Sequence, residues 1–142
     1  VTLRQNLRYS EVDADLEFGV SLCFTDDNER AEWEPGAEPV GKRAEAIQWA
    51  YEIGLTTWLS IEPVIDPAQA LGVIQWTHKW VDVFRVGKLN HDAAREARID
   101  WRGFLFQTLQ VLNDLGASYY IKDDLWAFAD REIRATWEKS RR

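Results

Sequence analysis

Cysteine is almost absent from this chain of 142 residues, which contains only Cys23 and has no methionine. A single cysteine forms no intrachain disulfide, and it cannot alone build a structural zinc or iron–sulfur site, because such sites need several ligands. The scarcity of cysteine favours the cytoplasm, where thiols stay reduced. The lack of methionine and the abrupt start in the apolar, strand-like stretch 1–3 predict a fragment of a larger gene product.

Histidine, positive charge and long apolar runs are also scarce. The two histidines, His78 and His91, are too few for a metal cage or a catalytic triad, although His91 follows a predicted strand end and stays a candidate functional group. The 17 Lys and Arg stand against 24 Asp and Glu, and this net charge of −7 makes the chain a poor ligand for a phosphate backbone. No apolar run approaches the ~18 residues of a membrane span, and no signal peptide is visible.

Apolar periodicity predicts strands that alternate with helices. Hydrophobic residues make up 46% of the chain, enough for one folded domain over residues 1–142. The expected strands are 18–24, 57–64, 81–90 and 117–122; the expected helices are 42–53, 67–79, 101–115 and 123–138, with a short irregular helix at 7–16, a rigid loop at 33–40 and a polar connection at 91–99. This alternation predicts an α/β fold with about four parallel strands, as a sheet or partial barrel.

The stretch 57–64 (TWLSIEPV) is where the strand pattern carries polar groups. Ser60 and Glu62 would point to one side of the strand, and Leu59 and Ile61 to the other. A serine and a carboxylate at the C-terminal end of a strand between two helices are typical of a barrel strand that delivers polar groups to a ligand site. The alternative is a partly exposed strand whose polar residues face water.

Polar residues recur near the ends of three successive predicted strands. They are Ser21 with Cys23, Ser60 with Glu62, and Lys88 with Asn90. In a barrel they would share one face at the C-terminal ends, where barrels place function. We expect Lys88 and Glu62 to neutralise each other, because inward charges must be paired. The alternative is that this pairing is purely structural, but the serines and the asparagine favour a site.

Two other motifs are weak candidates. The stretch 36–42 (GAEPVGK) matches the spacing of a phosphate-binding loop, but Glu38 would repel phosphate, Pro39 removes a donor and Arg43 replaces the hydroxyl that follows the lysine. The acidic run 26–29 lacks the glycine and the spacing of a calcium loop, and a solvated helix cap explains it better.

Four stretches, taken in order, resemble the second half of radical SAM proteins: FGVSLCFTDD (18–27), WEPGAEPVGKRAEAIQWAYEIGLTTWLSIEPVI (33–65), VDVFRVGKLN (81–90) and YYIKDDL (119–125). The closest branch is the spore photoproduct lyase-like (DNA photolyase-like) one. Order and spacing carry the resemblance, which extends from residue 18 to about residue 125.

The resemblance implies a (β/α)6 partial barrel to which this chain supplies roughly the third strand onward. The missing N-terminal half of the barrel is then the expected partner. It also implies S-adenosylmethionine (SAM) across the strand ends, cleaved reductively to a radical that abstracts hydrogen from a substrate. By position, Ser21 would approach the methionine or ribose part of SAM, Ser60 and Glu62 the ribose and its neighbours, and Lys88 and Asn90 the adenine or the substrate. The photolyase-like name implies a nucleic-acid substrate, which the acidic charge does not support.

The chain departs from the family at the iron–sulfur cluster. The CxxxCxxC loop that ligates the 4Fe–4S cluster is absent, and Cys23 cannot replace three thiolates. We therefore expect the chain alone to be unable to cleave SAM, and a complete radical SAM enzyme to carry that motif about 80–130 residues before Val1. The alternative is a catalytically silent α/β interaction module whose inward polar residues are structural.

Overall fold

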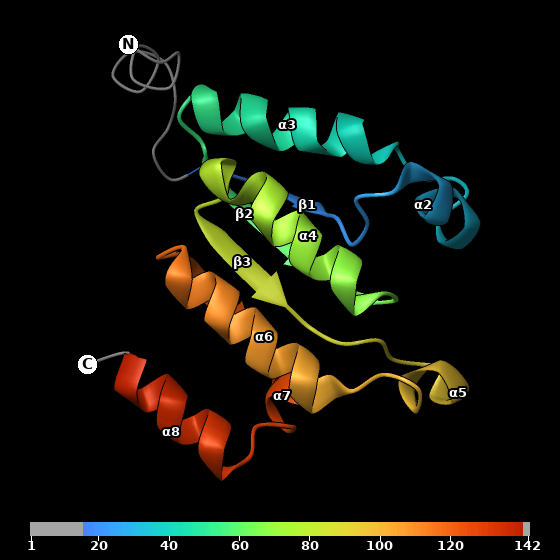
Figure 1. The fold of residues 1–142 in the computed structure, drawn as a ribbon. Helices are drawn as coiled ribbons and strands as arrows, with labels where there is room; N and C mark the ends of the chain where they lie inside the picture. Colours follow the sequence, from blue (N-terminus) through green and yellow to red (C-terminus); the bar gives the residue numbers. More distant parts are fainter. Residues whose placement is uncertain (1–15, 141–142) are drawn as a thin grey trace.

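The computed structural model describes residues 16–140, which form a four-stranded parallel sheet in the order β1-β2-β3-β4 (Figure 1). The strands are β1 (Glu17–Ser21), β2 (Thr56–Ile61), β3 (Val83–Val86) and β4 (Ser118–Ile121). The helices are α2 (Asp27–Trp33), α3 (Val40–Glu52), α4 (Pro67–Thr77), the short 3-10 helix η1 (His78–Trp80), α5 (Ala93–Glu96), α6 (Trp101–Asp114), α7 (Asp123–Trp126) and α8 (Arg131–Ser140). The predicted α/β fold with parallel strands alternating with helices is confirmed.

One face of the sheet is covered by α3, α4 and α6, which lie across it in Figure 1. Strand β2 shows the expected alternation, since Leu59 and Ile61 are fully buried against this layer while Trp58 and Ser60 are only partly buried. Phe84 and Val86 of β3 continue the buried row. The core therefore lies between the sheet and the helices, and the other face presents the second set of alternating side chains.

Aspartates begin most of these helices. The side chain of Asp26 accepts a hydrogen bond from the N–H of Asn28 at 2.8 Å and so caps α2, as the sequence predicted. Asp66 caps α4 in the same way and is followed by Pro67, which suits the first helical position. After α6, Gly116 has a φ of 65°, the left-handed conformation that commonly ends a helix.

Two predicted strands are shorter in the structure than the sequence suggested. The strand expected at 18–24 ends at Ser21, because Leu22, Cys23 and Phe24 are all buried and the alternation stops. The strand expected at 81–90 is ordered as β3 only from Val83 to Val86, and the chain beyond it turns inward rather than continuing the sheet. Continuous burial after a strand resembles strand hydrophobicity in sequence, so periodicity alone extended both elements.

Several helices also differ from expectation. The helix predicted at 123–138 is two helices, because Asp130 accepts a hydrogen bond from the N–H of Ile133 at 3.0 Å and begins α8 afresh. The connection predicted at 91–99 contains α5, and the predicted helix 67–79 ends as the 3-10 turn η1. The strand expected at 1–3 and most of the helix expected at 7–16 lie outside the described residues.

The N-terminal end of the sheet is closed by a small polar network. The Thr57 hydroxyl donates to the carbonyl oxygen of Trp80 at 2.6 Å and accepts from the N–H of Asp82 at 3.0 Å. The N–H of Thr57 in turn donates to the Asp82 carboxylate at 2.8 Å. Thr57 is completely buried, so these bonds satisfy polar groups that water cannot reach.

Candidate functional site

A cavity of about 490 Å3 opens at the C-terminal ends of the strands. Its lining comes from β1, β2 and the segments that follow β2, β3 and β4: Ser21, Ser60, Glu62, Pro63, Lys88, Asn90, His91 and Lys122. The structure therefore brings the five predicted site residues together, and it places His91 beside them. Parallel strands deliver their C-terminal ends to one edge of the sheet, which explains why residues far apart in sequence meet here.

Glu62 lines this cavity and pairs with Lys122. The Lys122 ammonium is 2.6 Å from Oε2 of Glu62. The carboxylate also lies directly over Gly87, where an added Cβ would collide with it. Oε2 is buried and has no aligned hydrogen-bond donor among the described residues, so its contact with Lys122 is an ion pair that leaves acceptor capacity unused.

The prediction that Lys88 and Glu62 form an ion pair is wrong. Lys88 pairs instead with Glu96 of α5, and its ammonium also donates to the carbonyl oxygen of Leu89 at 2.8 Å. The ammonium lies 5.4 Å from the centre of the Trp101 ring. Because β3 ends at Val86, Lys88 leaves the sheet and turns toward α5, so the side predicted from strand alternation does not apply to it.

Hydrogen bonds to backbone groups fix the position of the C-terminal end of β1. Arg43 of α3 donates to the carbonyl oxygen of Ser21 at 2.8 Å and also contacts the carboxylate of Glu34 at 3.3 Å. The next N–H, that of Leu22, donates to the carbonyl oxygen of Ser60 at 3.0 Å, which keeps the ends of β1 and β2 in register. The side chain of Ser21 is exposed at the cavity.

Cys23 does not share the cavity face with Ser21, in contrast to the prediction. It belongs to the buried core and is only 4% exposed. Burial, with a smaller contribution from the negative charge of Glu34, raises the pKa of its thiol to about 12. Cys23 is therefore a protonated core residue and has neither the exposure nor the thiolate character of a metal ligand or nucleophile.

Asn90 and His91 form the far side of the cavity. The Asn90 side chain donates to the carboxylate of Asp124 at 2.7 Å and accepts from Lys88 at 3.3 Å. His91 has a φ of 68°, a left-handed conformation that is uncommon for a residue with a side chain. Backbone conformations of this kind concentrate at functional sites, so His91 remains a candidate.

A stacked group on the sheet face beside the cavity was not anticipated from the sequence. The ring of Trp58 lies over Gly19, where any Cβ would collide with it, and the guanidinium of Arg85 lies 4.4 Å from the Trp58 ring centre. The register aligns Ser60 with Ser21 on one side and with Arg85 on the other. This arrangement places a fixed cation and an aromatic surface next to the serines.

Lys122 was not predicted as a site residue, although it ends the predicted strand 117–122. It follows β4, and the pairing of β3 with β4 brings it beside Gly87 and Glu62. The information that would have found it was the strand order, since each strand then contributes a residue just past its end. Periodicity within a single segment contains no such information.

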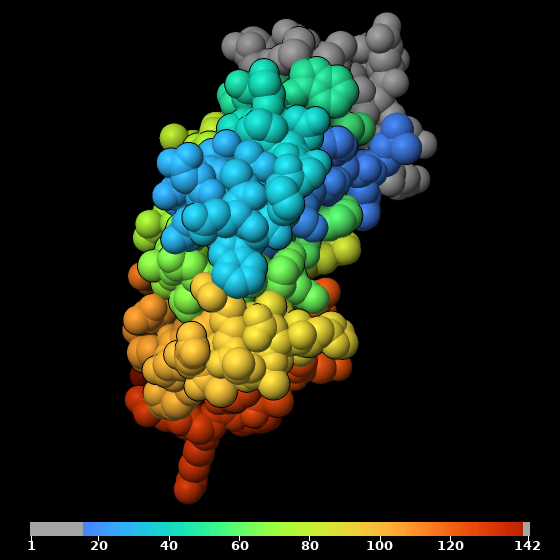
Figure 2. Space-filling view, turned by 90° about the vertical axis from the view of Figure 1, so that its right-hand side faces the viewer, coloured from blue at the N-terminus to red at the C-terminus, as the bar shows by residue number. Residues whose placement is uncertain are grey.

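The segments around α2 and α5 meet on the side of the molecule shown in Figure 2, in blue and in yellow to orange. The guanidinium of Arg95 in α5 stacks 4.3 Å from the ring centre of Trp33 in α2. These two helices follow β1 and β3 respectively, so the contact joins two of the loops that leave the strand ends.

The stretch 36–42, which runs into the first turn of α3, has structural partners of its own. Arg30 donates to the carbonyl oxygens of Glu34 and Ala37 and forms a two-pronged ion pair with Asp27. Asp27 also accepts from the N–H of Val40 at 3.0 Å, which engages a donor that a phosphate would need. The hydrogen bond from Arg30 holds the pKa of the Asp27 carboxyl below its usual value. These contacts agree with the rejection of this stretch as a phosphate-binding loop.

Within residues 16–140, no group of three or more His, Cys, Asp or Glu side chains is arranged to hold a metal ion. Over the same residues, none of the helices combines the length and the apolar composition that a membrane crossing requires. Comparison with protein-family models, with curated proteins and with solved structures gives no match to this chain.

Proposed function

We propose that the chain forms the later strands of a radical SAM barrel and supplies the SAM- and substrate-contacting strand ends, but not the cluster. The observation that carries the proposal is the cavity at the C-terminal ends of the parallel strands, lined by Ser21, Ser60, Glu62, Lys88 and Asn90. The order of the strands and the helices on one face are also what a part of such a barrel requires.

The residues present fit SAM. The Glu62 carboxylate lines the cavity and its side chain is 27% exposed, so it can accept from ribose hydroxyls or pair with an ammonium, and Ser60 adds a hydroxyl beside it. Lys88 and Lys122 offer cations to a carboxylate, and the Asn90 amide offers both a donor and an acceptor to the edge of an adenine. A cavity of about 490 Å3 lies within the range of small-molecule sites.

The residues do not fit the cluster. The sequence has one cysteine, and Cys23 is buried with a raised thiol pKa. Together with a reduced 4Fe–4S cluster, bound SAM supplies the hydrogen-abstracting chemistry of this superfamily. The thiolates for that cluster must therefore come from another segment, and we assign the residues of this chain to binding and orienting SAM and the substrate.

A second candidate, a catalytically silent interaction module, is favoured by one observation. The cavity charges already have partners in the chain, Glu62 in Lys122 and Lys88 in Glu96. Such pairs would be sufficient if the inward polar residues only stabilised the fold. The two proposals differ in whether SAM enters the cavity, which can be measured directly.

The test is SAM binding to the full chain by equilibrium dialysis with radiolabelled SAM. The double variant Ser60→Ala plus Glu62→Gln should weaken binding by about tenfold or more, because it removes a hydroxyl and the charged acceptor. The matched control is Ser118→Ala plus Glu17→Gln, which changes the same residue types at the N-terminal ends of β4 and β1, outside the cavity. Equal affinity in all three proteins, or no binding at all, would support the silent module.

Activity is tested on the complete protein that carries the CxxxCxxC segment. Reconstituted anaerobically, it should show the brown absorption of a 4Fe–4S cluster and release 5′-deoxyadenosine. The Ser60→Ala plus Glu62→Gln variant should keep the absorption and lose SAM affinity, because neither residue is a cluster ligand. Loss of the absorption in the variant would contradict the assigned roles.

A further inference from the structure

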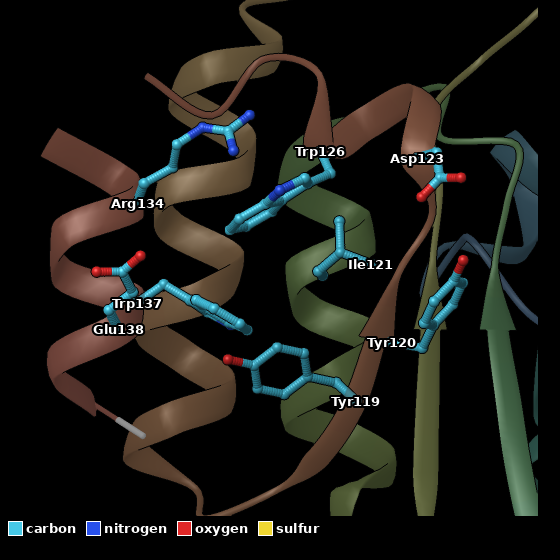
Figure 3. A pocket seen from close by; sticks show the side chains of 8 residues that line it. All are labelled: Tyr119, Tyr120, Ile121, Asp123, Trp126, Arg134, Trp137 and Glu138. Carbon is cyan, nitrogen blue, oxygen red and sulfur yellow. The ribbon is translucent and has the colours of Figure 1, made fainter. Parts of the chain in front are cut away.

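A second cavity of about 430 Å3 lies between β4 and α8, and none of its lining residues lines the strand-end cavity. Figure 3 shows the side chains of Tyr119, Ile121, Trp126 and Trp137 in the space between the strand and the helix, while Tyr120 lies on the opposite side of β4. The cavity is a groove with one wall made of strand and the other of helix. Grooves of this construction suit extended peptides.

The strand wall of the groove is an edge of the sheet. Among the described residues β4 pairs only with β3, so its second edge faces the groove. Backbone groups of successive strand residues point to opposite edges. Because the N–H of Lys122 donates to Val86 at 2.8 Å, toward β3, the preceding residue Ile121 directs its N–H and C=O into the groove. An added strand would find one donor and one acceptor there.

The floor of the groove is aromatic and held in place. The rings of Trp126 and Trp137 lie 5.4 Å apart at 60° to each other. Arg134 stacks 5.5 Å from the Trp126 ring centre, and its Nε donates to the carbonyl oxygen of Ala129 at 3.0 Å. Arg134 is therefore engaged by the helix and its neighbours, and the ring surface is a fixed site for a large apolar side chain.

Two carboxylates border the groove without a cation of their own. Asp123 follows β4 and Glu138 lies on α8, and within residues 16–140 neither forms an ion pair or a side-chain hydrogen bond. Among residues 16–140, the only cation that lines the groove is the engaged Arg134. A basic ligand is therefore complementary to this surface, and a phosphate backbone is not.

We propose that this groove binds an extended basic segment of a partner protein as a fifth strand on β4. A large apolar side chain of the segment rests on Trp126 and Trp137, and lysine or arginine side chains pair with Asp123 and Glu138. A second copy of the chain is a poor occupant, because its net charge of −7 repels an equally charged copy. The proposal does not depend on SAM binding.

The probe is the dye-labelled peptide acetyl-Lys-Val-Leu-Val-Lys-amide, whose two lysines and leucine share one side when it is extended. Fluorescence polarisation with the full chain should show saturable binding with a Kd of about 1 mM or tighter. Two further peptides carry N-methyl groups on alternate residues, one on the two valines and one on the leucine and the final lysine. Strand addition predicts that one pattern weakens binding about tenfold or more and the other leaves it nearly unchanged, since only alternate N–H groups face β4.

The variant is Glu138→Lys on α8, matched by Glu32→Lys on the exposed surface of α2. Glu138→Lys should weaken binding of the lysine-flanked peptide about tenfold and strengthen binding of a glutamate-flanked one, because the border charge is reversed. Glu32→Lys should bind both peptides like the original protein. Circular dichroism checks that both variants are folded, and Trp137→Ala, which removes the floor, should also weaken binding.

Four results would overturn the proposal. Equal effects of the two N-methylation patterns would exclude strand pairing. Unchanged binding in folded Glu138→Lys would place the peptide elsewhere. Sedimentation that shows a dimer competing with the peptide would assign the groove to a second copy, and competition by a short oligonucleotide would assign it to nucleic acid.

Discussion

The two ends of the same parallel sheet are built differently. At the N-terminal end, Thr57 and Asp82 satisfy each other and the Trp80 carbonyl inside the protein. At the C-terminal end, Glu62 and Lys122 pair beside a cavity of about 490 Å3, and their side chains are 27% and 40% exposed. Buried polar groups with partners inside the protein stabilise a fold, whereas partly exposed ones at a cavity are available to a ligand. The contrast therefore assigns stability to one end and recognition to the other.

The sharpest test of where the cavity stops is the reactivity of Cys23, two residues beyond Ser21. Because burial raises the pKa of its thiol to about 12, the thiolate fraction at pH 8 should be roughly 1,000-fold below that of an unfolded cysteine. Iodoacetamide labelling followed by mass spectrometry should be correspondingly slow, and fast in urea. The control is Ala31→Cys on α2 in a Cys23→Ala background, which should react like a free thiol.

The raised pKa of Cys23 also sets a direction for stability against pH. The folded thiol holds its proton more strongly than the unfolded thiol, so the contribution is fully present below the unfolded pKa of about 8.5 and is lost as pH rises toward 12. In Cys23→Ala this alkaline loss should shrink. Rapid labelling of native Cys23 at pH 8 would instead extend the cavity past Ser21.

The next largest effect is expected at the closed end. Thr57→Val keeps the shape of the side chain but removes the hydroxyl that donates to the Trp80 carbonyl, while the Asp82 N–H keeps the Thr57 carbonyl oxygen as its acceptor. The free energy of unfolding should fall by about 2 kcal/mol, measured by urea denaturation. Ser60→Ala, on the same strand but at the cavity, should cost less than about 0.5 kcal/mol. Equal losses in the two variants would remove the contrast between the ends.

The smallest effect is expected for the ion pair at the open end. Lys122→Gln removes the partner of Glu62, but the Lys122 side chain is 40% exposed, so solvent screens most of the interaction. The free energy of unfolding should change by less than about 1 kcal/mol, and raising the salt concentration should change the original protein by a similar small amount. A loss above about 2 kcal/mol would show that this end, too, is built for stability.

The fold was largely predictable, because buried and less buried side chains alternate regularly in the central part of the sheet. In β2, Leu59 and Ile61 alternate with Trp58 and Ser60, and this period of two is visible in the sequence. The ends were predicted less well, since Leu22 and Cys23 are buried after β1 has ended and burial there does not alternate. The break between α7 and α8 was missed because the apolar stripe runs across it.

Much of the cavity lining was predictable, whereas Lys122 and the electrostatic pairing were not. Placing polar residues at the ends of parallel strands brought Glu62 and Lys88 to the same cavity. Which cation meets Glu62 depends on how the chain leaves each strand, and Lys88 turns toward Glu96 while Lys122 stays beside the sheet. Turn geometry beyond a strand end depends on tertiary contacts, which a single sequence does not reveal.

The glycine beneath the Glu62 carboxylate has a consequence for how this chain can diverge. Any side chain at position 87 would displace Glu62, and Lys122 packs against the same point. A change at one of the three positions alters the space or the charge left to the other two, so their substitutions are not independent. In descendants of this chain, glutamate, glycine and lysine at positions 62, 87 and 122 should be inherited or replaced together, as one heritable unit.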